Sequence, residues 1–585
     1  MRQFFKFMLA SMAGLFLTMF LLFIFFLMMV SSLVKEKTIS VSDHSVLEVN
    51  LNFEIRERSS DNPFQDFSLG NIKTGKRLGL NDILRCIRNA KNDIHIDGIF
   101  LNLTGAEGGL ATIEEIRSAL LDFKSSGKFI YAYSEGYSQR EYYLASLADK
   151  IYLYPEGEVD LRGFRANLMF FKGTLEKLEI EPEVIRHGKF KSAVEPFILD
   201  KMSKENREQT TAFIGNMWSK VLEDVSASRK LTTQELQEAA NNLSGRSAKS
   251  ALAAKLVDEL AYSDQVMDDL KKKTGVSESG NLHRISLREY ADSFNESQDY
   301  TAPKIAIIYA AGDIVSGKGD ADQIGSATIA AAIRKARTDS TIKAIVLRVN
   351  SPGGSALASD VIWRETVLAK KAKPLVVSMG DYAASGGYYI SCTANKIIAQ
   401  PNTITGSIGV FGLLMNTQKL FNNKLGVTFD TVKTAQMATL GDPNYPMTDS
   451  ERSIIQQSVE DIYGTFIQHV AEGRKMLASD VDSIGQGRVW SGTDAKRLGL
   501  VDDLGGINKA IDEARQLAKL DKYRVIELPQ EKKFIDKLFE DLNDQAATQR
   551  MKAELGTLYD QYQGLKSALQ WQGVQARLPY VIDIR

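Results

Sequence analysis

The 585-residue chain has few of the residues that build metal sites or disulfide frameworks, and no excess of positive charge. It contains only two cysteines, Cys86 and Cys392, no Cys-x-x-Cys pair, and five histidines without ligand spacing. This composition argues against a zinc site or a disulfide framework, and both cysteines lie in apolar stretches where a free thiol is usually buried. The formal net charge is −1, whereas nucleic-acid binding normally needs a basic surface. We therefore expect no metal, no other cofactor and no nucleic-acid partner.

A long hydrophobic run lies near the N-terminus, where Met8 to Val34 carries no charged residue. As a helix this run would span about 40 Å, enough to cross a hydrocarbon core of about 30 Å with some tilt. It is longer than the roughly 7–15 residues of a cleavable signal peptide's apolar region. Residues 1–36 are therefore predicted to form an uncleaved transmembrane signal anchor. Arg2 and Lys6 slightly favour the N-terminus inside and the body outside.

The rest of the chain is too long for one core and contains an internal repeat. One constant offset aligns residues of the two halves, as in the pairs Ile87 and Ile333, Asp93 and Asp339, Ile96 and Ile342, Tyr142 and Tyr388, Lys150 and Lys396, and Gly163 and Gly409. Continuous apolar runs alternate with helical segments in the same order in both halves. This alternation predicts an α/β fold in which a parallel sheet is covered by helices on both sides.

The domain boundaries follow from this repeat and from composition. We predict a first repeat over residues 37–276, a polar linker over 277–302 and a second repeat over 303–525. Residues 526–585 lie outside the repeat and form a tail. Amphipathic helices are expected in the tail near 530–545 and 550–572, before an apolar end that could pack against an unidentified partner.

Ser385 is the candidate nucleophile. It follows a predicted strand in the segment SMGDYAASGGYY, where small residues leave space around its hydroxyl. A hydroxyl at the start of a helix faces unpaired backbone N–H groups, which can stabilise an oxyanion. The alternative is that Ser385 only caps the helix, which is the commoner role of serine there. The first repeat has Gln139 at the equivalent position.

A glycine-rich turn after the preceding strand is the second candidate element. In RVNSPGGSA, Gly353 and Gly354 would let the backbone approach a substrate carbonyl closely. Adjacent parallel strands place this turn beside Ser385. The N–H of Gly354, with that of Ser385 or Gly386, could then form an oxyanion hole, although such turns are often only turns.

Lys191 is the candidate general base. It lies in GKFKSAVEP in the half that lacks the serine, and the second half has Ala438 at the corresponding place. Apolar neighbours such as Phe190, Val194 and Phe197 suggest burial, which disfavours the ammonium and lowers a lysine pKa. Ser-Lys pairs are a known variant of the catalytic triad. The alternative is an ordinary solvated lysine.

Four segments together, KSAVEPF, NSPGGS, GDYAASGGYYI and TGSIGVFG, resemble the long tandem-repeat form of the signal peptide peptidase A (protease IV) family. The resemblance implies a Clp-protease/crotonase-like fold in each repeat, with Ser385 as nucleophile and Lys191 as general base. It implies an oxyanion hole at Gly353, Gly354 and Gly386. It further implies a homotetrameric bowl on the bacterial inner membrane, with the catalytic body on the periplasmic side and signal-peptide remnants as substrates.

Three functions are therefore compared. The favoured one is a membrane-anchored serine endopeptidase that forms an acyl-enzyme and cleaves extended peptides with small or apolar residues near the cut. A crotonase-like acyl-CoA hydratase or isomerase would need paired carboxylates in place of Ser385 and Lys191. A catalytically inactive membrane scaffold is the third, because Gln139 in the first repeat shows that the serine can be lost.

Overall fold

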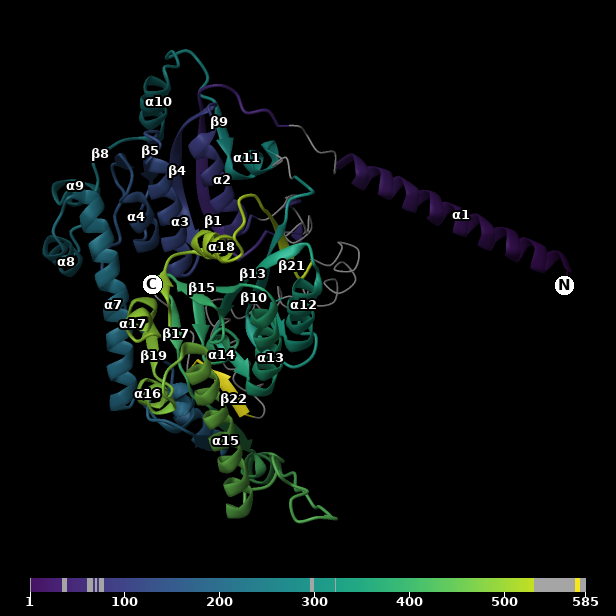
Figure 1. The fold of residues 1–585 in the computed structure, drawn as a ribbon. Helices are drawn as coiled ribbons and strands as arrows, with labels where there is room; N and C mark the ends of the chain where they lie inside the picture. The colour runs from purple at the N-terminus through teal and green to yellow at the C-terminus, as the bar shows by residue number, and fades with distance from the viewer. Residues whose placement is uncertain are drawn as a thin grey trace.

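The computed structural model describes residues 2–33, 39–59, 67–68, 71–72, 78–294, 299–320, 322–530 and 574–578. Each half of the chain builds a sheet flanked by helices, and the two halves lie against each other (Figure 1). The predicted α/β class with parallel sheets is confirmed, because strands and helices alternate and the central strands of both sheets run parallel.

The first sheet belongs to the first half and has the order β8-β6-β5-β4-β1-β9, with every pair parallel. Its central strand β4 carries the apolar run predicted to be buried, and Ile99, Phe100 and Leu101 are at most 1% exposed. Such a strand needs helices on both faces. The bounds are β1 (Ser45–Glu54), β4 (Ile96–Glu107), β5 (Phe129–Ser134), β6 (Lys150–Leu153), β8 (Glu259–Leu260) and β9 (Arg284–Ser286).

The second sheet repeats this order, with β10, β13, β15 and β16 in the places of β1, β4, β5 and β6. β17 also pairs with the far end of β15, and β19 pairs antiparallel with β17. The bounds are β10 (Lys304–Ala311), β13 (Ile342–Ser351), β15 (Leu375–Ala384), β16 (Lys396–Ala399), β17 (Ile404–Gly406), β19 (Val489–Ser491), β20 (Asp503–Leu504) and β21 (Arg524–Leu528).

Helices cover these sheets, and polar side chains cap several of their ends. Ser203 and Thr448 accept hydrogen bonds from the N–H groups of Asn206 and Glu451, so both act as N-caps. The helices of the first half are α2 (Leu80–Asn92), α3 (Leu110–Lys124), α4 (Gln139–Ala145), α5 (Lys172–Leu178), α6 (Glu195–Ile198), α7 (Lys204–Arg229), α8 (Thr233–Asn241), α9 (Ala248–Ala253), α10 (Ser263–Thr274) and α11 (Leu287–Ser293). Those of the second half are α12 (Ser326–Thr338), α13 (Ala356–Ala372), α14 (Gly386–Tyr389), α15 (Asp449–Arg474), α16 (Ala478–Ile484), α17 (Gly492–Arg497) and α18 (Ile507–Leu517).

A third sheet joins segments from distant parts of the chain in the order β12-β11-β14-β22-β18-β7. The first half contributes β7, which pairs antiparallel with β18 of the second half. The bounds are β7 (Glu181–Arg186), β11 (Asp313–Val315), β12 (Gln323–Gly325), β14 (Gly353–Ser355), β18 (Phe411–Asn416) and β22 (Val574–Arg577). This sheet carries a segment of the first half across to the second.

One apolar cluster spans both halves, and a further cluster lies almost entirely in the second half. Helix α18 of the second half packs between the two halves, and its buried residues Ile507, Ala510 and Ala514 belong to the same cluster as Leu103 of β4 and Val346 of β13. The relative position of the halves is therefore fixed by packing.

Some predicted segments differ or remain open. The predicted linker contains β9 and α11, and β9 pairs with β1 as β21 pairs with β10, so this segment also completes the first sheet. The helices expected near 530–545 and 550–572 lie outside the described residues.

Helix α1 (Arg2–Leu33) extends away from the body in Figure 1. Among the described residues, no helix meets the length and hydropathy required of a membrane span, so the predicted anchor is not confirmed. The remaining short elements are β2 (Phe67–Ser68), β3 (Asn71–Ile72), the 3-10 turn η1 (Ser192–Val194) and the π-helical turn η2 (Leu420–Leu425).

Candidate active site

Ser385 lies at the junction between β15 and α14, on a strained backbone. Its φ is 54° and its ψ is −113°, a conformation that costs a residue with a side chain about 1–3 kcal/mol. Two backbone hydrogen bonds hold it there: its N–H donates to Gly406 O, and its carbonyl accepts from Tyr389 N, both at 2.8 Å. Among the described residues its hydroxyl caps no helix end. The hydroxyl is therefore available for other contacts.

Lys191 reaches this hydroxyl from the other half of the chain. It follows β7 at the start of η1, and its Nζ lies 2.9 Å from Ser385 Oγ. The backbone of Gly487 packs directly against it: a methyl group built on Gly487 would lie 2.6 Å from Lys191 Cβ. The pairing of β7 with β18 and the buried side chains of Val194 and Phe197 place the lysine across the repeat boundary. The two residues predicted from separate repeats are thus within hydrogen-bonding distance.

The surroundings of Lys191 favour an uncharged amine. The side chain is 0% exposed, and burial lowers the pKa of Lys191 well below its usual range. Among the described residues no carboxylate forms an ion pair with it to counter this effect. Besides Ser385 Oγ, Nζ contacts Ser407 Oγ at 3.1 Å and Ser407 O at 3.2 Å. Ser385 Oγ in turn lies 3.4 Å from Gly409 O, to which its hydroxyl can donate. A neutral amine has two N–H donors and one lone pair, so donation to both Ser407 oxygens would leave the lone pair to accept the proton of Ser385.

Ser407 is a site residue that we did not predict from the sequence. It directly follows β17, has a φ of 49° and is fully buried. It lies in the segment TGSIGVFG, and the first repeat has Leu161 at the equivalent place. That difference between the repeats, a hydroxyl in the half that carries Ser385 and an apolar residue in the other, was a usable signal.

Gly353, Gly354 and Gly386 surround the same point. A methyl group built on Gly353 would lie 2.9 Å from Gly386 N, and the φ of Gly353 is 107°. Only glycine adopts this conformation at such a close approach without strain. The N–H of Gly353 donates to Ser351 Oγ at 3.1 Å. The N–H groups of Gly354 and Gly386 are the remaining candidates for binding an oxyanion.

The equivalent positions of the two repeats have different environments. Gln139 begins α4, and its side chain bonds Gly163, donating to Gly163 O at 3.0 Å and accepting from Gly163 N at 2.7 Å. Ala438, the counterpart of Lys191, is exposed in the loop before α15. One chain therefore holds one pair of this kind among its described residues.

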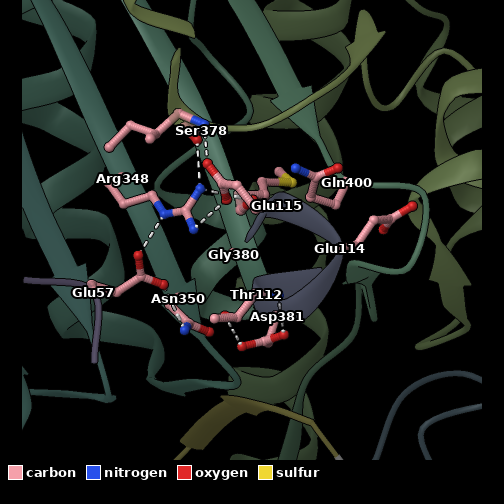
Figure 2. Close-up of polar contacts among 12 residues, drawn as sticks. Glu57, Thr112, Glu114, Glu115, Arg348, Asn350, Ser378, Gly380, Asp381 and Gln400 are labelled. Carbon is pink, nitrogen blue, oxygen red and sulfur yellow. Dashed lines mark hydrogen bonds and ion pairs between the residues drawn. The ribbon is translucent and has the colours of Figure 1, made fainter. Parts of the chain in front are cut away.

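A buried polar cluster fixes β15 against the first half (Figure 2). Arg348 of β13 is fully buried and pairs with Glu57 at 2.7 Å and with Glu115 of α3 at 2.9 Å, and it donates to Ser378 Oγ at 2.8 Å. Both carboxylates hold the pKa of Arg348 above its usual range despite burial, whereas burial raises that of Glu115.

Two further contacts join α3 to the second half near this cluster. Asp381 of β15 accepts from Thr112 N at 3.0 Å and from Thr112 Oγ1 at 2.6 Å. Asn402 N donates to Glu114, whose pKa burial raises to about 8. Since β15 ends one residue before Ser385, these contacts position the serine relative to the half that supplies Lys191.

Comparison with known proteins adds evidence from relatives. The model of peptidase family S49 matches residues 122–277 and again residues 368–521. Protease 4 of Salmonella typhi is 44% identical over 458 residues, covering 76% of this chain and 73% of that protein. Protease 4 of Haemophilus influenzae is 38% identical over 456 residues, with the same coverage. The chloroplastic serine protease SPPA of Arabidopsis thaliana is 34% identical over 450 residues, covering 76% of this chain and 66% of that protein.

Proposed function

Because the chain belongs to peptidase family S49 and is a serine protease, we propose that Ser385 is its nucleophile and Lys191 its general base. The observation that supports this most is the 2.9 Å contact between Lys191, which is buried and has no carboxylate partner among the described residues, and a serine at a strand–helix junction. Family membership also weighs against the acyl-CoA enzyme and the inactive scaffold, neither of which is favoured by a specific feature of the site.

In the proposed mechanism the neutral amine of Lys191 accepts the proton of Ser385 Oγ as this oxygen attacks the carbonyl carbon of a peptide. The oxyanion that forms is stabilised by the N–H groups of Gly354 and Gly386. Lys191, now an ammonium, returns the proton to the departing amine, and the acyl group remains on Ser385 as an ester. Water then attacks this ester with Lys191 again acting as base, which releases the acid and restores the serine. Ser407 holds the Lys191 amine in place throughout.

We further propose that the substrates are cleaved signal peptides or similar apolar peptides, and that α1 anchors the enzyme in the bacterial inner membrane with its catalytic body on the periplasmic side. The uncharged run from Met8 to Val34 supports the anchor, and the motif resemblance supports the substrate class. A membrane location would place the site near apolar peptides that remain in the bilayer after secretion.

We propose a homotetramer because a strand pairing that the chain makes once has a repeat counterpart whose two segments are left unpaired among the described residues. In the chain, 181–186 (β7) pairs with 411–416 (β18). The repeat counterparts of these strands are 428–433 and 165–170, and neither is paired in the described structure. Val432, the counterpart of the buried Ile185, is 96% exposed. The segment between η2 and α15, to which it belongs, projects beside α15 in Figure 1.

The same pairing made between copies would join residues 428–433 of one chain to 165–170 of the next. Such a head-to-tail contact closes into a ring when the rotation permits. The motif resemblance indicates four copies in that ring.

The proposed dyad is tested by peptidase assays on the full chain in detergent, comparing wild type, Ser385→Ala, Lys191→Ala and Lys191→Arg. General-base catalysis typically contributes about 10²–10⁴-fold, and a guanidinium does not deprotonate, so each variant should lose kcat by about that factor or more. Lys189→Ala removes an exposed lysine two residues away and should keep full activity. Substantial activity in folded Ser385→Ala or Lys191→Ala protein would refute the assignment.

A further inference from the structure

The last described segment of the chain occupies a slot one strand wide next to Ser385. β22 lies between β14 and β18 and runs antiparallel to both. On one side Ala576 faces Gly354, and on the other Gln575 faces Phe411. Extended peptides bind exposed strand edges through main-chain hydrogen bonds, and here both edges of the slot are already in use.

The carbonyl of Ala576 lies at the candidate oxyanion-binding glycines. A methyl group built on Gly353 would lie 2.1 Å from Ala576 O, and one built on Gly386 would lie 3.1 Å from it. The catalytic mechanism requires the carbonyl of the cleaved bond to reach the same place. A substrate carbonyl and the Ala576 carbonyl cannot occupy this volume together.

Side-chain and backbone contacts on both sides of Ala576 hold the segment in the slot. Ala576 is 1% exposed and Leu578 is 2% exposed. Leu578 N donates to Pro352 O at 2.7 Å, and Arg577 pairs with Asp313 of β11 at 2.7 Å. Ser385 itself is 0% exposed in this arrangement. The segment is therefore docked as a bound peptide would be.

We propose that Val574–Leu578 is an internal ligand of the peptide-binding groove, so that a peptide substrate binds only after this segment has left. The proposal rests on the proposed function in one respect, namely that the groove beside Ser385 is the substrate site. Its ligand is an extended peptide with a small residue at the position of Ala576, because that side chain is enclosed. The segment thus makes the protease autoinhibited.

The test measures peptide binding in the full chain with Ser385→Ala, which prevents cleavage. The probe is a fluorescein-labelled peptide with the sequence of Val574–Leu578, followed by anisotropy. Two added substitutions should release the tethered segment: Arg577→Glu places a negative charge against Asp313, and Ala576→Trp cannot fit the enclosed position. If the segment fills the groove in about nine of ten molecules, its release should lower the apparent Kd of the probe about tenfold.

Arg497→Glu is the matched control, since it reverses the charge of an arginine that is 67% exposed and pairs with Asp494 away from the groove. It should leave the probe Kd unchanged. An unchanged or higher Kd in both Arg577→Glu and Ala576→Trp would overturn the proposal.

Peptidase assays with Ser385 intact separate this proposal from the proposed function. Arg577→Glu should lower KM with little change in kcat, because it removes a competitor without touching the reacting groups. If every protein lacks peptidase activity while the binding results hold, the proposed function fails and the internal ligand remains. If wild type is active and both Arg577→Glu and Ala576→Trp match it in KM and in probe binding, the internal ligand is rejected alone.

Discussion

At the scale of single residues, the proposed dyad depends on one lysine whose burial favours the uncharged amine. Lys191 is fully buried, and its three polar neighbours are the oxygens of Ser385 and Ser407. A buried ammonium without a carboxylate is costly, so the fold stabilises the form of the lysine that can accept a proton. The same burial that prepares the base therefore reduces the stability of the protein.

This cost predicts a pH-dependent gain in stability for Lys191→Met. Burial lowers the pKa of the folded lysine below its unfolded value, so between the two values the unfolded chain binds one more proton. Stability then rises with pH by about 1.4 kcal/mol per unit from this group. Lys191→Met should raise Tm at pH 7, and the gain should shrink toward pH 10. Thermal unfolding at several pH values measures it, with Lys189→Met as control; a gain independent of pH would contradict a neutral Lys191.

Ser385 and Lys191 could be predicted from the sequence because the two repeats differ at these positions. The first repeat has Gln139 in the place of Ser385, and the second has Ala438 in the place of Lys191. The glycines that the structure brings together were also predicted. Ser407 was not predicted, because a serine after a short strand has no distinguishing local pattern. Its one signal in the sequence is the difference from Leu161 in the first repeat, and its contact with Lys191, formed between residues 216 positions apart, is seen in the structure.

At the scale of elements, strand β15 links Ser385, the proposed nucleophile, to the first repeat. Its Ser378 and Asp381 join the polar contacts with Arg348 and with Thr112 of α3, and Ser385 follows its last residue (Figure 2). A shift of α3 against β15 would therefore alter the distance between Lys191 and Ser385. Breaking the cluster should affect stability first and catalysis with it.

Arg348→Met tests this element directly. It leaves Glu57 and Glu115 buried without their cation, and breaking one partner of a buried ion pair costs about 3–5 kcal/mol. We expect a lower Tm and a reduced kcat. The triple variant Glu57→Gln, Glu115→Gln, Arg348→Met removes all three charges and should recover much of the lost Tm. Equal Tm values for the single and triple variants would show that the uncompensated carboxylates are not the cause.

The helices and strands predicted best were those whose apolar residues recur with a clear period along the sequence. The alternating helical segments include α13 (Ala356–Ala372), with Ser355 as its N-cap, and the continuous apolar runs form β4, β13 and β15. The third sheet was not predicted, because its strands come from 181–186, 411–416 and 574–577. Hydrophobic periodicity reports only local structure, and the pairing of such distant segments leaves no mark in it.

At the scale of the whole molecule, the duplication creates two copies of one strand pairing. The first copy, β7 with β18, forms within the chain, whereas the second, between 428–433 and 165–170, is not formed in the described structure. Residues 181–186 cross to the second repeat and carry Lys191 with them. Their counterparts at 428–433 lie in an exposed loop, and the residue that follows them in the place of Lys191 is Ala438. We infer that the internal copy serves catalysis and that the open copy serves assembly.

Val432→Glu tests that inference, because it places a charge where Ile185 is buried in the internal copy of the contact. Wild type in detergent should be a homo-oligomer by light scattering coupled to size exclusion, and the variant should dissociate to smaller species. The dyad lies within one chain, so the dissociated variant should retain most of its kcat toward short peptides. Leu477→Glu, at another apolar residue that is 68% exposed, should leave the assembly unchanged. A monomeric wild type, or an intact oligomer in Val432→Glu, would rule out this contact, because a buried glutamate facing an apolar strand edge costs several kcal/mol.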